Sequence, residues 1–165
     1  MPEDIIPVRP DERLDEERLA DYLRGRLPGS DKPLALRQFG GGAANLTYLL
    51  DYDGQEYVLR RPPLGPVAAS AHDMRREFRV LSVLHHAFPP APRAFLLCED
   101  EAIIGAPFFV MERRQGVVVR RAMPAPFAGQ PEAARAMSEA LVDTLMENST
   151  RMPLEDARTP RRRKK

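Results

Sequence analysis

The stretch that decides the fold is FGGGAANLTYLL at residues 39–50, where three glycines separate two apolar segments. Glycine has no Cβ and tolerates positive φ, so a glycine run lets the backbone approach another group closely. Between two strands that group is often a phosphate, which backbone N–H groups hold. Glycine runs also form plain turns, so residues 40–45 indicate a phosphate-binding loop only if further parts follow in order.

The segments around this loop predict a three-stranded meander. Residues 34–39 form one short strand, and residues 45–51 form the next. Asp53-Gly54 is a strong signal for a hairpin turn, and a third strand over 55–61 follows it. That third strand carries Arg60 near its end. A cation thus follows a glycine loop by one hairpin strand, which is how kinases hold the phosphates of ATP.

The remaining elements are predicted from helical spacing, caps and apolar runs. We expect an irregular arm over 1–13, then a helix over 16–27 capped by Asp15, and after the meander a helix capped by Ser70. Strands over 93–98 and 107–112 and a short strand at 117–119 should follow. The last element is a helix from Pro131, whose apolar face consists of Ala134, Met137, Leu141 and Leu145. This order predicts an α+β fold with an antiparallel sheet of about five strands and one crossing helix. The glycine run lacks the GxxxxGK[ST] pattern of a βαβ nucleotide fold.

Composition limits the function classes. The 165 residues suffice for one domain with its own core. The net charge of +1 gives no global field that favours nucleic acid or a membrane. Cys98 is the single cysteine, which excludes an internal disulfide and fits a reducing compartment. Without a bilayer-spanning apolar run or a signal peptide, we expect a cytoplasmic protein with no membrane partner.

Four stretches together carry a resemblance to one family. They are GGAANLTY at 41–48, YVLRRPP at 57–63, MRREFRVL at 74–81 and FFVMER at 108–113. In this order and spacing the chain resembles the N-terminal lobe of the aminoglycoside phosphotransferase/choline kinase-like family. The nearest branch is the kinase-like domain fused to, or encoded beside, some acyl-CoA dehydrogenases. The resemblance implies a protein-kinase-like lobe with its hinge and first C-lobe helix over 1–145, followed by a tail over 146–165.

The resemblance also implies an ATP site. Loop 40–45 would cover the phosphates, and Arg60 would contact them from the position of the kinase lysine. Glu77 would pair with Arg60 and fix its direction, as the Lys–Glu pair does in kinases. Residues 111–113 would be the hinge that holds adenine by backbone hydrogen bonds. The implied cofactor-binding residues are Gly40, Gly41, Gly42, Ala43, Ala44, Asn45, Arg60, Glu77, Met111, Glu112 and Arg113. Candidate walls of the adenine slot are Leu36, Leu59 and Val110.

Two residues depart from the family pattern. Arg60 replaces the usual lysine, and a guanidinium binds phosphate bidentately but is not interchangeable with an ammonium. The branch named above commonly carries arginine there. Ala44 stands where the family often has serine, which removes a hydroxyl donor near the phosphates.

The catalytic parts of the family are absent from this sequence. Phosphoryl transfer needs a base and carboxylates that hold Mg²⁺, and the family supplies them from a second lobe with an HGD-type motif. His72, His85 and His86 are the histidines, and none begins His-Gly-Asp. We therefore assign no catalytic and no metal-binding residue, and read the three histidines as surface or boundary residues. Mg²⁺ is expected only with the missing lobe, which would also choose the small-molecule acceptor.

The predicted function is an ATP-dependent small-molecule phosphotransferase cut short before its catalytic lobe and inactive alone. The alternative is a non-catalytic interaction or regulatory module built on the same lobe. The tail over 146–165 is expected to be disordered, as after truncation or a shifted reading frame. Its basic end, RTPRRRKK at 158–165, also suits nucleic acid, but it lacks interleaved aromatics and the body is near neutral. A last helix without its packing partner predicts self-association.

Overall fold

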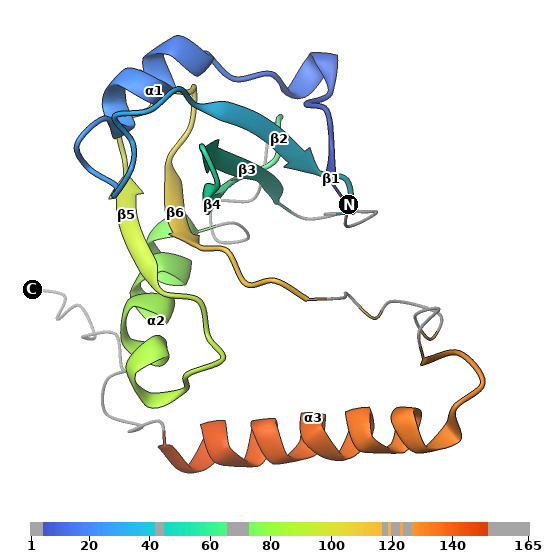
Figure 1. Cartoon of the computed structure of the whole chain (residues 1–165). Helices are drawn as coiled ribbons and strands as arrows, with labels where there is room; N and C mark the ends of the chain where they lie inside the picture. Colours follow the sequence, from blue (N-terminus) through green and yellow to red (C-terminus); the bar gives the residue numbers. More distant parts are fainter. Residues whose placement is uncertain are drawn as a thin grey trace, which may run out of the picture.

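The molecule is built on one antiparallel sheet of six strands, in the order β1-β2-β3-β4-β6-β5 (Figure 1). The computed structural model describes residues 5–41, 45–65, 73–116, 119, 123 and 127–151, with side chains up to residue 146 in the last helix. The strands are β1 (Ile5–Ile6), β2 (Ala35–Phe39), β3 (Leu46–Tyr52), β4 (Gln55–Arg61), β5 (Ala94–Cys98) and β6 (Phe108–Glu112). The predicted α+β class is confirmed, with one strand more than expected.

The β3–β4 hairpin forms as its turn signal predicts. Asp53 and Gly54 have φ of 54° and 88°, which is the pair of positive values that a type I′ turn needs. The Asp51 side chain accepts a 2.8 Å hydrogen bond from the Gly54 N–H and so braces the turn. The strands then stay in register up to the pair Leu46 and Arg61, beside the end of the glycine loop.

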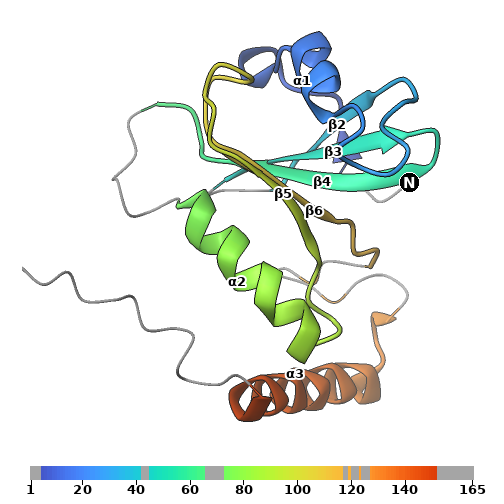
Figure 2. The same cartoon turned by 90° about the vertical axis from the view of Figure 1, so that its left-hand side faces the viewer.

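A different helix packs against each face of the sheet (Figure 2). Because side chains alternate along a strand, one face holds a core with α1 (Glu16–Leu23), and the other faces α2 (Met74–Ala87). The core with α1 consists of buried side chains from both layers, namely Leu14, Leu19, Leu23, Leu27, Leu46, Tyr48, Leu50, Tyr52, Tyr57, Leu59, Cys98, Ile104, Phe108 and Val110. On the α2 side, the rings of Phe78 and Phe109 meet edge to face, 6.5 Å between centroids.

The predicted helix over 16–27 is too long. Its N-cap is confirmed, since Asp15 accepts a 3.0 Å hydrogen bond from the Arg18 N–H. The helix ends at Leu23, however, because Gly25 takes a φ of 72° that no helix continues. Leu27 lies beyond this turn and is still buried in the core. Its apolar spacing therefore extends the helical pattern past the true end.

The predicted cap of the second helix is wrong. Asp73, not Ser70, is the N-cap of α2, and its side chain accepts a 3.0 Å hydrogen bond from the Arg76 N–H. Asp73 and Ser70 are three residues apart and both are good caps, so the sequence alone does not choose between them. Ser70 itself lies outside the described residues.

The arm over 1–13, predicted to be irregular, contains regular structure. Ile5 and Ile6 pair with Phe39 and Gln38 and add a sixth strand at the edge of the sheet. A 3-10 helix, Pro10–Glu12, follows this strand. A strand of two residues shows no alternation of polarity, so its pairing depends on contacts that the local sequence does not reveal.

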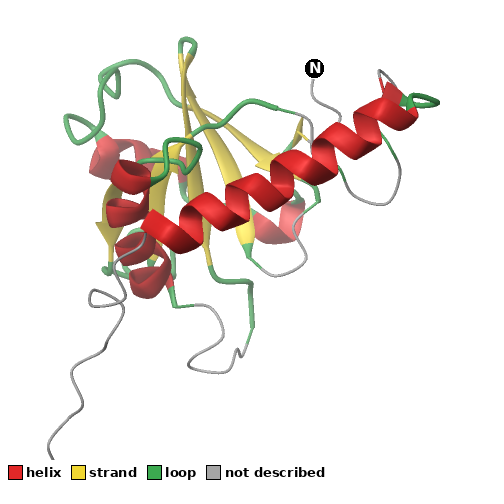
Figure 3. Cartoon of the chain, turned by 90° about the horizontal axis from the view of Figure 1, so that it is seen from below, coloured by secondary structure: helices red, strands yellow, loops and turns green. Residues whose placement is uncertain are grey.

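The last helix starts at Pro131 as predicted but runs on to Arg151, so residues 146–151 of the predicted tail are helical. Figure 3, viewed from below, shows α3 (Pro131–Arg151) as one long helix across the strands. Residues 152–165 and residues 117 and 118 of the predicted short strand lie outside the described residues. No helix in the described part of the chain is long and apolar enough to cross a bilayer.

Candidate functional site

The site is centred on an ion pair between the sheet and α2. Nε of Arg60, on β4, lies 3.3 Å from Oε2 of Glu77, in the first turn of α2. Nε is buried and makes no hydrogen bond within the described residues, so the contact is electrostatic. The side chains of Arg60 and Glu77 are 35% and 27% exposed, so the pair lies at the edge of the buried region. The predicted Arg60–Glu77 pair is confirmed.

Asn45 is the second partner of Glu77. Its Nδ2 donates a 3.1 Å hydrogen bond to Oε1, whereas Nε of Arg60 lies nearest to Oε2. Asn45 is only 5% exposed. It directly precedes β3, at the far end of the glycine loop. Sequence reasoning placed Asn45 in the loop and missed this contact, which depends on α2 folding back against the sheet.

The side chains that share the face of Arg60 follow from the register. Thr47 and Phe109 lie opposite Arg60 on the two neighbouring strands. Val58, two residues before Arg60, pairs with Leu49 on β3 and with Met111 on β6. These partners point to the same face because opposed residues in an antiparallel pair do so. The face of Arg60 is therefore apolar around Val58, while Arg37, which pairs with Leu49, is a second cation on the same face.

The predicted walls of the adenine slot are wrong. Leu59 and Val110 are fully buried in the core with α1, and Leu36 packs against that core. Leu59 is adjacent to Arg60, so the two side chains point to opposite faces of the sheet. A slot on the Arg60 face would instead be walled by Val58 and Met111. Apolar character alone does not distinguish the two faces of the sheet, whereas the two-residue period of a strand does.

The predicted hinge residues Glu112 and Arg113 contact the segments on both sides of β6. The N–H of Glu112 donates a 2.8 Å hydrogen bond to the carbonyl oxygen of Arg93, and the Glu112 carboxylate accepts one of 3.1 Å from the Arg93 N–H. Arg113 forms an ion pair with Glu56 on β4 and is 11% exposed. The Glu112 N–H is thus unavailable to a ligand, and donors to an adenine would have to come from later residues.

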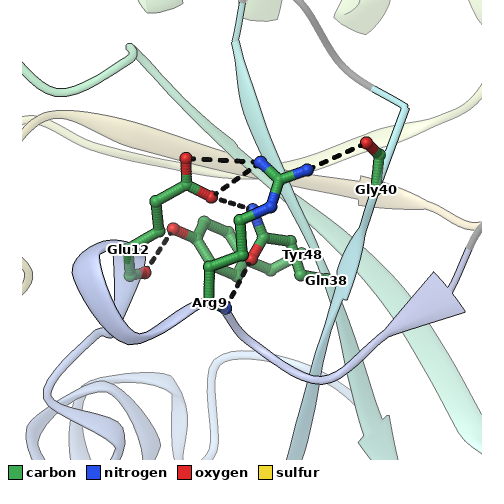
Figure 4. A network of polar contacts seen from close by, with 5 residues as sticks. All are labelled: Arg9, Glu12, Gln38, Gly40 and Tyr48. Carbon is green, nitrogen blue, oxygen red and sulfur yellow. Dashed lines mark hydrogen bonds and ion pairs between the residues drawn. The ribbon is translucent and has the colours of Figure 1, made fainter.

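The near end of the glycine loop is held by a polar network (Figure 4). Nη2 of Arg9 donates to the Gly40 carbonyl oxygen at 3.1 Å, and the Arg9 N–H donates to the Gln38 side chain at 3.0 Å. Gln38 also donates to the Glu12 carboxylate, and the Tyr48 hydroxyl donates to the Glu12 carbonyl oxygen at 2.7 Å. No sequence signal pointed to this network. Gly42, Ala43 and Ala44 lie outside the described residues.

Neighbouring charged residues have structural roles. Arg61, next to Arg60, points to the other face, is 6% exposed and donates a 2.8 Å hydrogen bond to the Ile104 carbonyl oxygen. Burial lowers the pKa of Arg61. His85 is half-buried on α2, where its Nδ1 lies 3.0 Å from the Leu81 carbonyl oxygen, and His86 is exposed beside it. These two histidines lie at the surface and boundary, as predicted, while His72 is outside the described residues.

Residues 35–163 match the sequence profile of the phosphotransferase enzyme family (APH). The chain belongs to this family. Among relatives in the family branch, it is 39% identical over 115 residues to acyl-CoA dehydrogenase family member 10 of Mus musculus, with 69% of this chain and 11% of that protein covered. It is 40% identical over 119 residues to family member 11 of Gallus gallus, with 70% and 15% covered.

A solved structure gives the same assignment for the fold. The crystal structure of a protein from Ralstonia eutropha, assigned as an aminoglycoside phosphotransferase, is 34% identical and superposes with a TM-score of 0.55. It covers 68% of this chain, whereas this chain covers 32% of it. The sheet and helices are therefore those of a kinase-like phosphotransferase. The chain spans about a third of this neighbour and less than a fifth of the relatives above.

Proposed function

We propose that this chain is the nucleotide-holding lobe of an ATP-dependent small-molecule phosphotransferase. The observation that carries the proposal is the Arg60–Glu77 ion pair, one strand after the glycine loop. In kinases a cation in this position grips the phosphates, and a helical glutamate orients it. Membership of a phosphotransferase family supports the same reading.

The chain's own residues fit a nucleotide on chemical grounds. The Arg60 side chain is 35% exposed, so its guanidinium is proposed to donate hydrogen bonds to a phosphate while it stays paired with Glu77. In the proposed complex, the backbone of residues 40–45 donates to the phosphates. Val58 and Met111, on the face of Arg60, offer an apolar surface for the base. The hinge donors lie after Glu112, whose N–H is taken by Arg93.

Chemistry is proposed to come from sequence that this chain does not contain. Phosphoryl transfer needs a base and Mg²⁺ ligands, and Glu77 is already shared between Arg60 and Asn45. We therefore propose that these 165 residues alone bind ATP weakly and do not turn it over. The acceptor is proposed to be a small molecule chosen outside this chain. An acyl-CoA-linked hydroxy acid is one candidate, which rests on the resemblance to the branch associated with acyl-CoA dehydrogenases. We propose the cytoplasm as the compartment, in line with the free thiol of Cys98.

The test is a titration of the isotopically labelled chain with Mg·ATP, followed by backbone amide shifts in NMR. We expect shifts to gather at residues 40–45, Arg60 and the residues after Glu112, with weak affinity and no ADP formed. Arg60→Met removes the phosphate-binding cation and should abolish these shifts. Arg79→Met is the matched control, because Arg79 is exposed on α2. Shifts that persist in Arg60→Met, or ATP turnover that requires Arg60, would contradict the proposal.

A second candidate is a non-catalytic interaction or regulatory module. The observation in its favour is an apolar stripe on α3, where Leu141, Val142, Leu145 and Met146 are 56–64% exposed. Nucleotide dependence separates the two readings. Partner binding that is unaffected by both ATP and Arg60→Met would favour the module.

A further inference from the structure

We propose that Asn45 is a positioning residue that directs Arg60 by holding the carboxylate between them, and so couples the glycine loop to the phosphate-binding cation. This inference rests on the proposed function for its consequence, but its geometry stands on its own. The three side chains come from three different elements: the loop end before β3, strand β4 and helix α2.

The carboxylate of Glu77 contacts two side chains, one through a hydrogen bond and one through an ion pair. Oε1 accepts from Nδ2 of Asn45 at 3.1 Å, and Oε2 lies 3.3 Å from Nε of Arg60. An ionised carboxylate only accepts hydrogen bonds, so the amide of Asn45 must present its NH₂ group. With each oxygen engaged, the carboxylate cannot rotate about its last bond without losing a partner. The direction of Arg60 is thus set by a group that Asn45 holds in place.

The burial of Asn45 raises the cost of losing its hydrogen bond to Glu77. Asn45 is 5% exposed, so water cannot readily replace its amide at Oε1. Loss of the donor would leave a partly desolvated carboxylate oxygen, which would turn toward solvent or draw Arg60 into a different pose. Asparagine suits the position because it donates without adding charge. An aspartate of equal size would place a second negative charge beside Glu77.

The location of Asn45 links the ion pair to the loop. Asn45 ends the glycine loop and leads into β3, where Thr47 lies opposite Arg60. The other end of the loop, Gly40, is tied to the N-terminal arm by Arg9. The end of the loop at Asn45 is therefore connected to Arg60 through Glu77, and the end at Gly40 is connected to the N-terminal arm.

The experiment follows the Arg60 Nε–H signal in ¹⁵N NMR of the whole chain without nucleotide, assigned by its loss in Arg60→Lys. In Asn45→Ala we expect this signal to shift and its proton to exchange with water about tenfold faster, the scale set by one charged hydrogen bond. Asn45→Asp keeps the side-chain volume and should do the same. The control is Asp51→Asn, which weakens the Arg37–Asp51 pair (3.5 Å) on the same sheet.

An unchanged Arg60 signal in both Asn45 variants overturns the inference, as does an equal change in Asp51→Asn. A Mg·ATP titration then separates the two proposals. We expect Asn45→Ala to weaken binding about tenfold and Asp51→Asn to leave it unchanged. If the Arg60 signal responds to Asn45 but the unmodified chain shows no ATP-dependent shifts, the positioning role stands and the proposed function fails. If ATP binds equally well to Asn45→Ala, the coupling fails and the function stands.

Discussion

The guanidinium of Arg9 donates a 3.1 Å hydrogen bond to the carbonyl oxygen of Gly40, across 31 positions of the chain. Its Nη1 also pairs with Glu12 at 3.3 Å. The N-terminal arm is thereby tied to the residue at which the glycine loop begins. This contact joins the segment between β1 and the 3-10 helix to one end of the candidate site.

We expect Arg9→Met to lower the free energy of unfolding by about 1–2 kcal/mol, because the carbonyl oxygen and the Glu12 carboxylate lose a charged partner. Amide exchange at Gly40 and Gly41 should accelerate as well. Urea unfolding and hydrogen exchange measure the two effects. The control is Arg24→Met, whose pair with Asp21 is 62% exposed on each side and should change stability by less than about 0.5 kcal/mol. Equal losses of stability in the two variants would show that the Arg9–Gly40 hydrogen bond stabilises the fold no more than an exposed ion pair does.

An alanine at position 40 should fit only if the Ile6 side chain moves. A Cβ at this position would lie 3.2 Å from Cδ1 of Ile6, tighter than ordinary contact. We expect Gly40→Ala to destabilise the chain by about 1 kcal/mol, the range of mild overpacking. Adding Ile6→Val removes Cδ1 and should recover most of the loss. A double-mutant cycle in urea measures the coupling, and strictly additive effects would show that the two residues do not compete for space.

The parts that sequence predicts well are those with local signals. Asp53-Gly54 sets the β3–β4 hairpin, so both strands were placed within a residue, and Arg60 with them. The resemblance then supplied Glu77. The errors come from contacts that join distant segments. The sequence around Ile5 carries no signal for its pairing with Phe39. The sequence around Arg9 likewise carries no signal for its hydrogen bond to Gly40.

A second kind of error concerns faces rather than contacts. Leu59 was assigned to the nucleotide slot although it neighbours Arg60, and alternation alone excludes that placement. The sequence itself therefore carries the information that excludes Leu59 from the slot. The contact of Asn45 with Glu77 is different, since it requires the position of α2 relative to β3, which no local pattern contains. Sequence thus indicates the kind of site more securely than the side chains that support it.

Loss of the side-chain hydroxyl should have opposite effects on stability at Tyr52 and at Tyr48. The Tyr52 hydroxyl is buried without a hydrogen-bond partner in the described part of the chain, whereas the Tyr48 hydroxyl donates to the Glu12 carbonyl oxygen at 2.7 Å. Tyr52→Phe removes an unpaired polar group and should leave stability unchanged or raised by up to about 1 kcal/mol. Tyr48→Phe should cost about 1 kcal/mol. Thermal and urea unfolding compare them, and a larger loss in Tyr52→Phe would reveal a partner for its hydroxyl.

Alkaline pH is expected to destabilise the fold through its buried tyrosines. Burial raises the pKa of Tyr48 and of Tyr52 to about 12, against about 10 in an unfolded chain. Between these values the unfolded state has lost protons that the folded state keeps, so the free energy of unfolding falls as pH rises from about 10 to about 12. Urea unfolding between about pH 9 and about pH 11 should show this slope. The slope should be shallower in Tyr52→Phe, and an identical slope would mean that Tyr52 titrates normally.

The apolar stripe on α3 predicts self-association of the isolated chain. Leu141 and Leu145 lie one helical turn apart and are 60% and 56% exposed, and Val142 and Met146 extend the patch. A contiguous patch of this kind on a helix usually marks an interface. Sedimentation velocity should show a concentration-dependent species that the double substitution Leu141→Gln, Leu145→Gln removes without altering the far-UV circular dichroism. Val83→Gln is the matched control, since Val83 is 49% exposed on α2. A chain that stays monomeric at all concentrations, or that Val83→Gln disrupts equally, would show that α3 is not the contact surface.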